Sequence, residues 1–92
     1  MAGYLLKWCW DQKITPTQKL VLMALNEHAY YERGVWMCPS SHATVAALTG
    51  LTTQSICRVI ADLFELGLVD FQGNVDGRRS VYVLNAPPRV QA

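Results

Sequence analysis

The chain has 92 residues, of which 51% are hydrophobic and 16% are charged, and its formal net charge is +1. Enough apolar side chains are present for one packed core, so the composition excludes a disordered chain, and the length leaves no room for a second domain. The near-zero charge excludes a polybasic mode of nucleic-acid binding, although it allows a local basic edge.

Neither a membrane span nor a secretory signal is expected. No apolar run approaches the roughly 18 residues of a transmembrane helix, and the start at Met1 lacks the basic and apolar regions of a signal peptide. We therefore expect a cytoplasmic protein. The cysteines Cys9, Cys38 and Cys57 are odd in number and widely spaced, which favours reduced, buried thiols over disulfides.

The first third of the chain predicts two segments rich in apolar side chains. Residues 4–10 are rich in aromatic side chains and precede any clear cap, so we expect a short helix or an extended arm docked on the domain. Thr15 is a typical N-cap and Pro16 suits the first helical position, which predicts a helix that continues until Gly34. Its inward stripe comprises Leu20, Val21, Ala24, Leu25 and Ala29.

The middle of the chain predicts a short strand and then a short helix. Residues 35–38 are β-prone and end at Pro39. Ser41 then caps a helix that ends at Gly50, a residue type that commonly closes helices in the left-handed conformation. The inward side chains of this helix are expected to be Val45, Ala46 and Leu48.

The cleanest helical pattern of the chain follows a tight turn. Leu51 is expected to anchor the turn, Thr52 is a typical N-cap, and Gly67 ends the helix. The apolar residues recur at helical spacing on one face: Ile56, Val59, Ile60, Leu63 and Leu66.

Beyond Gly67 the hydrophobic period becomes that of strands. Residues 68–72 and 80–84 are rich in β-branched and aromatic side chains, and the Gly-Asn and Asp-Gly pairs between them predict a hairpin with a long tip. Residues 86–92 contain two prolines and read as a tail or linker, so the domain is placed at residues 1–85 and the native chain is expected to continue past residue 92.

Together these elements predict a fold of the α+β class, mainly helical: a winged helix-turn-helix with a three-helix core and a small antiparallel sheet. The hairpin is the wing, and residues 35–38 are its expected third strand. In this geometry the helix that begins after Thr52 inserts its N-terminal half into the DNA major groove.

The candidate DNA-binding residues lie on the outward face of that helix, which holds Thr53, Gln54, Ser55, Cys57 and Arg58. Gln54 offers a donor and an acceptor to adenine, and Arg58 reaches guanine or a phosphate. Hydroxyls of Thr52, Thr53 and Ser55, together with Ser41 at the start of the preceding helix, suit phosphates near helix N-termini. The alternative interpretation is ordinary capping by the hydroxyl residues and a solvated surface charge at Arg58.

The wing adds a pair of arginines. Arg78 and Arg79 suit phosphate contact or the minor groove, whereas the alternative is protection of an edge strand by charge. Residues 51–85 carry three arginines against four carboxylates, so few phosphate contacts and a shallow salt dependence are expected. Useful affinity would then need a dimer or further domains.

No other residues form a recognisable chemical site. The cysteines and the two histidines lack the short paired spacing of a zinc site, and no catalytic constellation or phosphate-binding glycine loop is present. We therefore expect no metal, no cofactor and no enzyme activity. Trp8, Trp10 and Trp36 are expected in the core or on a dimer face.

The chain resembles the small winged helix-turn-helix domains of phage, prophage and plasmid proteins. The resemblance extends to about Leu84 and rests on residues 6–10, 14–29, 38–41, 45–46, 49–51, 56–60, 63 and 66–69. Some members are replication initiators of the replication protein O type, and others are transcriptional regulators. The resemblance implies that residues 52–55 and Arg58 face DNA and that Ser41 lies near a phosphate. Two departures are the Thr-Thr-Gln-Ser run, where basic residues are commoner, and His42, where an apolar residue is common.

The sequence thus predicts a non-enzymatic module that binds double-stranded DNA sequence-selectively, as a homodimer or within a longer protein, in replication initiation or transcriptional regulation alongside proteins of those processes. The alternative is a winged helix used for protein–protein contact or dimerisation without DNA. The near-neutral charge and an apolar patch around Tyr4, Trp8 and Trp10 favour that alternative.

Overall fold

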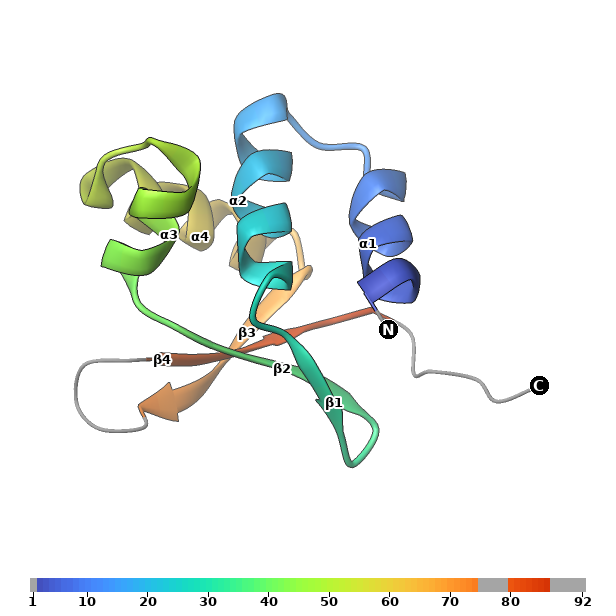
Figure 1. Ribbon diagram of the computed structural model, residues 1–92. Coiled ribbons are helices and arrows are strands. Elements are labelled where there is room, and N and C mark those ends of the chain that lie inside the picture. Colours follow the sequence, from blue (N-terminus) through green and yellow to red (C-terminus); the bar gives the residue numbers. More distant parts are fainter. Residues whose placement is uncertain (1, 75–79, 87–92) are drawn as a thin grey trace.

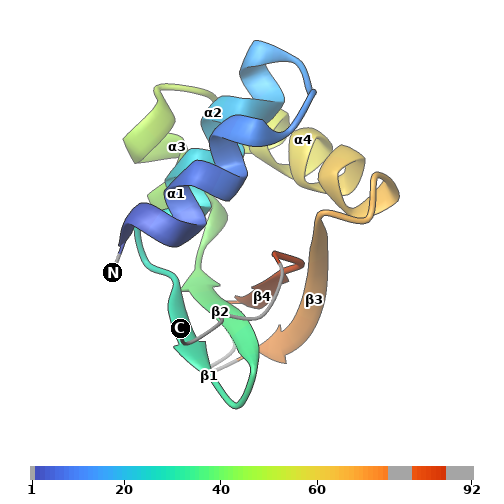
Figure 2. The same cartoon turned by 90° about the vertical axis from the view of Figure 1, so that its right-hand side faces the viewer.

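The computed structural model describes residues 2–74 and 80–86, which form four helices on one side of a four-stranded antiparallel sheet (Figures 1 and 2). The strand order is β1-β2-β4-β3. The elements are α1 (Ala2–Asp11), α2 (Pro16–Asn26), β1 (Tyr30–Glu32), β2 (Val35–Ser40), α3 (His42–Thr49), α4 (Thr53–Glu65), β3 (Val69–Asn74) and β4 (Ser80–Leu84). This arrangement confirms the predicted mainly helical α+β winged helix, with α1 added to the three-helix core.

The start of α2 is fixed by a reciprocal cap. The Thr15 hydroxyl accepts from the Gln18 amide N–H at 3.2 Å, and the Gln18 side chain accepts from the Thr15 N–H at 3.1 Å. Pro16 occupies the first helical position, as predicted. The aromatic N-terminal segment forms α1, which packs against α2 and buries Leu5 and Cys9 almost completely.

The predicted continuation of α2 to Gly34 is wrong. The helix ends at Asn26, and residues 30–32 form the additional strand β1, paired with β2 through a two-residue connection. Arg33 and Gly34 both have positive φ, 52° and 83°, as a type I′ turn requires. The Tyr31 ring packs on Trp36 with centroids 4.8 Å apart, so cross-strand packing outweighs the helical pattern.

Strand β2 also runs further than predicted, through Pro39 to Ser40. Strand β1 pairs with residues 35–37, so no other described strand pairs with that edge of β2 beyond Met37, and a residue without an N–H is accommodated there. The other edge of β2 pairs with β4 from Trp36 to Ser40, which confirms residues 35–38 as a third strand beside the hairpin.

A single core lies between the helices and the sheet. Its fully buried side chains come from α1, α2, β2, α3, α4, β3 and β4: Leu5, Cys9, Val21, Leu22, Leu25, Cys38, Val45, Ile56, Leu63, Val69 and Leu84. Three leucines predicted to point inward are instead exposed: Leu20, Leu48 and Leu66. Leu20 and Leu48 lie at the rim of the junction between α2 and α3, and Leu66 follows the last residue of α4, where the chain turns away. Within the described residues, no helix has both the length and the apolar character needed to cross a bilayer.

The contrast between two leucines of one predicted stripe tests this core. We expect Leu63→Ala to lower the free energy of unfolding by about 2–5 kcal/mol, because it opens a cavity among fully buried side chains. Leu66→Ala should change it by less than about 1 kcal/mol, since that side chain is 54% exposed. Urea unfolding of both variants measures the difference, and equal losses would contradict the described end of α4.

Candidate nucleic-acid interface

The turn between α3 and α4 is built from a glycine and a buried anchor. Gly50 has a φ of 79°, and its N–H donates to the Ala46 carbonyl oxygen at 2.8 Å, which closes α3. The Leu51 N–H donates to the Thr49 hydroxyl at 3.2 Å, while its half-buried side chain packs against the core. The two helices therefore meet at a fixed angle, as a helix-turn-helix requires.

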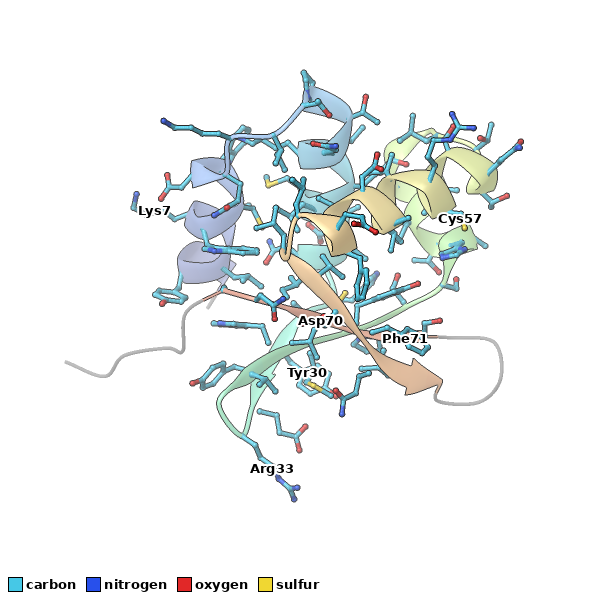
Figure 3. The ribbon with its side chains drawn as sticks, turned by 180° about the vertical axis from the view of Figure 1, so that it is seen from behind. Lys7, Tyr30, Arg33, Cys57, Asp70 and Phe71 are labelled. Atoms are coloured by element: carbon cyan, nitrogen blue, oxygen red, sulfur yellow. The ribbon has the colours of Figure 1, made fainter. Side chains whose placement is uncertain are left out.

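Helix α4 presents one buried and one open face. The buried face is apolar and comprises Ile56, Val59, Ile60 and Leu63. On the opposite face Thr53, Gln54, Cys57 and Arg58 are exposed, so neither α1 nor any other described element covers these four side chains. Figure 3 shows Cys57 on this side of the molecule, far from Lys7 on α1.

The hydroxyl residues at the start of α4 are partly engaged with one another. The Thr52 hydroxyl accepts from the Ser55 N–H at 3.1 Å and donates to the Ser55 hydroxyl at 3.0 Å, and Ser55 is half-buried. Thr52 is therefore the N-cap, as predicted. The same pattern recurs at α3, where Ser41 accepts from the Thr44 N–H at 3.1 Å and lies 2.9 Å from its hydroxyl.

The first turns of α3 and α4 carry no negative charge that would repel an anion. Neither α3 nor α4 carries an acidic residue in its first turn, so the positive ends of both helix dipoles are not offset by local carboxylates. Among the described residues, Arg58 forms no ion pair, and the ion pair that is present joins Lys7 to Asp11 at 3.3 Å on α1. Arg78 and Arg79, predicted to contact phosphate, lie outside the described residues.

Two side chains that the sequence analysis did not assign to the site tie the wing to the helices. His42, the first residue of α3, has its Nε2 3.1 Å from the Tyr82 hydroxyl on β4. Burial raises the pKa of the Tyr82 phenol, which keeps that hydroxyl protonated. The Asn85 amide donates to the Gly67 carbonyl oxygen and to Asp70, each at 2.9 Å, which fastens the end of β4 to the junction of α4 and β3.

The three cysteines do not share one environment. Burial raises the pKa of the Cys9 thiol to about 11 and that of the Cys38 thiol to about 12, and Cys38 donates to the Leu25 carbonyl oxygen at 2.7 Å. Cys57 is exposed, which corrects the expectation that all three thiols are buried and agrees with the outward position of Cys57 in the helical pattern. Its side chain lies away from the buried stripe of Ile56, Val59, Ile60 and Leu63.

The aromatic residues of α1 serve mainly to dock that helix. Tyr4 stacks on the buried Trp36 with ring centroids 5.9 Å apart, and Trp8 is half-buried against the core. Trp10 is 59% exposed, and Lys19 lies over its ring, with Nζ 5.6 Å from the centroid. Within residues 2–74 and 80–86, no group of three or more His, Cys, Asp or Glu is placed to hold a metal ion.

The exposure of α4 predicts the order of thiol reactivity. In the folded protein we expect Cys57 to react with a thiol reagent near neutral pH, while Cys9 and Cys38 stay unreactive because they are buried and their pKa values are raised. Cys57→Ser should remove the fast reaction, and denaturant should release the remaining thiols. Fast labelling of Cys9 or Cys38 in the folded protein would contradict the packing of α1 and β2.

Comparison with known proteins adds one match. The family model described as "MarR family" matches residues 12–80, from just after α1 to the start of β4. It therefore covers the helix-turn-helix, the wing strand β3 and both candidate DNA-facing helix starts. No curated protein and no solved structure matches the chain.

Proposed function

We propose that this chain, which belongs to the MarR family of winged-helix transcription regulators, binds double-stranded DNA sequence-selectively through the open face of α4. The observation that carries the proposal is that Thr53, Gln54 and Arg58 are exposed on one face of a helix whose other face is locked into the core. A helix held in this way can enter the major groove without rearranging the domain.

Base recognition is assigned to two side chains. Gln54 can pair with the N6 and N7 atoms of adenine, and Arg58, one helical turn further on, can donate twice to guanine. Both are exposed, and neither forms a side-chain hydrogen bond with another described residue, so neither must give up an internal contact in order to bind. Because they lie four positions apart on one face, they would read neighbouring base pairs.

Backbone contacts are assigned to the helix starts and the wing. Ser41 and Thr52 place the first turns of α3 and α4, whose N–H groups suit phosphate oxygens. Thr53 and Ser55 add hydroxyls beside the second of these starts. Contact of Arg78 and Arg79 with phosphate or the minor groove remains a prediction from the sequence.

Operator recognition in transcription is the role that the family membership favours. Replication initiation, the other role inferred from the sequence, remains a prediction that no observation here supports separately. Because the family is generally non-enzymatic, the proposal assigns the chain a regulatory role without catalysis. It further places the protein in the cytoplasm, with a DNA duplex and a second copy of the chain as its partners.

Removing either base-reading side chain should reduce specificity. We expect Gln54→Ala and Arg58→Ala each to lose about 1–3 kcal/mol of discrimination at one base pair, because each deletes a bidentate contact. Selection of duplexes from a random pool, followed by gel-shift titration of the selected site and its single-base variants, measures the loss.

A cation elsewhere on the chain provides the matched control. Lys7→Ala also removes one positive charge, but Lys7 is on α1, on the other side of the molecule from Cys57 (Figure 3). It should leave the preferred site and the discrimination unchanged. Unaltered site preference in both Gln54→Ala and Arg58→Ala would show that α4 does not read bases.

The salt dependence separates this proposal from a protein–protein role. Binding to duplex DNA should weaken as salt rises, with a shallow slope of about 0.9 per phosphate contact, because few cations are available. An apolar contact with a protein would change little over the same range. Duplex affinity measured by fluorescence anisotropy at several salt concentrations distinguishes the two, and no detectable duplex binding at low salt would favour the alternative.

A further inference from the structure

The open face of α4 carries a third side chain beside Gln54 and Arg58. Cys57 is exposed and forms no hydrogen bond with another described residue. Successive residues of a helix lie about 100° apart around its axis, so Cys57 lies about 60° from Gln54, on the side away from Arg58. The order across the open face is therefore guanidinium, amide and thiol.

Cys57 also lines an apolar hollow between α4 and the wing strands. The hollow has a volume of about 310 Å³, and α4 contributes Cys57, Ala61 and Phe64 to its walls. Phe71 of β3 and Tyr82 of β4 also line it, with their rings in edge contact and their centroids 5.9 Å apart. In Figure 3 Cys57 and Phe71 lie on the same side of the molecule, one on the helix and one on the strand. The wing side of Cys57 is therefore flanked mainly by carbon atoms.

The polar groups that line this hollow already have partners. The His42 Nε2 atom lies 3.1 Å from the Tyr82 hydroxyl, and the Asp70 carboxylate accepts a hydrogen bond from the Asn85 amide at 2.9 Å. Among the described residues, no lysine or arginine lines the hollow. A phosphate oxygen would therefore find no guanidinium or ammonium group here and would meet the charge of Asp70. The surface beside Cys57 suits an apolar group of the duplex.

Thymine is the base that brings such a group to the major groove. Its C5 methyl is the apolar substituent among the base edges displayed there, whereas the other edge groups are hydrogen-bond donors or acceptors. A thiol behaves as a small hydrophobic group, so its contact with a methyl group removes apolar surface from water. An amino group at the same place would lose its water and gain only a weak sulfur acceptor in return.

We propose that Cys57, together with the exposed Ala61 one helical turn further on, selects thymine through an apolar contact with its C5 methyl group. The assignment rests on the proposed function, because it needs α4 in the major groove. Cys57 lies about 4.5 Å further along the helix axis than Gln54, close to the roughly 3.4 Å between stacked base pairs. The thymine is therefore expected in the base pair that Gln54 contacts or in the next one.

Replacing thymine by uracil tests the contact from the side of the DNA, because uracil lacks only that methyl group. In the duplex selected by the wild-type protein, each thymidine is replaced in turn by deoxyuridine, and gel-shift titration measures the affinity. One replacement, at or beside the base pair where Gln54→Ala relaxes specificity, should raise the dissociation constant about threefold to fivefold, as expected for one methyl group lost from a buried contact. The other replacements should leave the dissociation constant nearly unchanged.

Cys57→Ser tests the contact from the side of the protein. Serine is close to cysteine in size but polar, so this variant should bind the thymine duplex and the uracil duplex nearly equally. The exposed position favours normal folding of the variant, which circular dichroism verifies. Arg58→Ala is the matched control on the same face, because it should lose discrimination at guanine and keep the full preference for thymine over uracil.

Thiol labelling of the wild-type protein locates the contact without any substitution. In the complex with the selected duplex, Cys57 should react with a thiol reagent at least about tenfold more slowly than in the free protein, because the base edge covers it. An unchanged labelling rate in the saturated complex would contradict the proposal.

The outcomes separate this inference from the proposed function. Suppose that the protein binds a selected duplex and that Gln54→Ala and Arg58→Ala relax its specificity. If no thymine then responds to the loss of its methyl group, or if the response persists in Cys57→Ser, the thymine contact is wrong and DNA recognition stands. A selected site without a fixed thymine in or beside the Gln54 base pair has the same meaning. If no duplex binds, the proposed function fails and the thymine contact fails with it.

Discussion

The burial of the apolar stripe of α4 is the constraint on which the rest of the structure depends. Ile56 and Leu63 are fully buried and lie two helical turns apart, so they fix both the position and the rotation of the helix. The rotation of the helix about its own axis decides which side chains face outward, because successive residues lie about 100° apart around that axis. Because the buried stripe that includes Ile56 points inward, Cys57 and Arg58 face solvent. The candidate interface is therefore a consequence of core packing.

A second set of contacts holds the wing relative to that helix. The Asn85 amide bridges Gly67 and Asp70, while His42 at the start of α3 lies against Tyr82 on β4. Each contact joins residues at least 15 positions apart in the chain, so together they tie the hairpin to both helices of the helix-turn-helix. A wing anchored at its base keeps a constant angle to α4, which a protein that reads a groove and grips the adjacent backbone needs.

The sequence predicted the elements whose signals are local. Thr15, Ser41 and Thr52 all cap helices, and Gly50 closes α3, because a cap depends on side-chain and backbone groups within about four residues. The open face of α4 followed from its periodicity. Strand β1 is a local feature that the helical pattern concealed, because Tyr31 and Trp36 lie five positions apart on either side of the turn at Arg33 and Gly34. The contact of His42 with Tyr82 is non-local, since the two residues lie forty positions apart and no pattern in either segment predicts it.

The errors about exposure have the same origin. Leu48 and Leu66 fit their helical stripes, but an inward-pointing position buries a side chain only where another element lies opposite it. Leu48 reaches the edge of α2, and Leu66 falls after the last residue of α4. Strand β4 shows the converse. Its apolar residues follow strand propensity, but only Tyr82 and Leu84 are buried, whereas Val81 and Val83 are half-buried.

The weak net charge of the chain bears on how it could select a DNA site. A domain with a net charge of +1 can neutralise few phosphates, so one copy gains little affinity from the DNA backbone. Under the proposed function, binding would then depend mainly on the base contacts of Gln54 and Arg58, so a site with matching bases is favoured over random DNA. Low charge would serve selectivity, because it keeps the chain from binding tightly to every duplex.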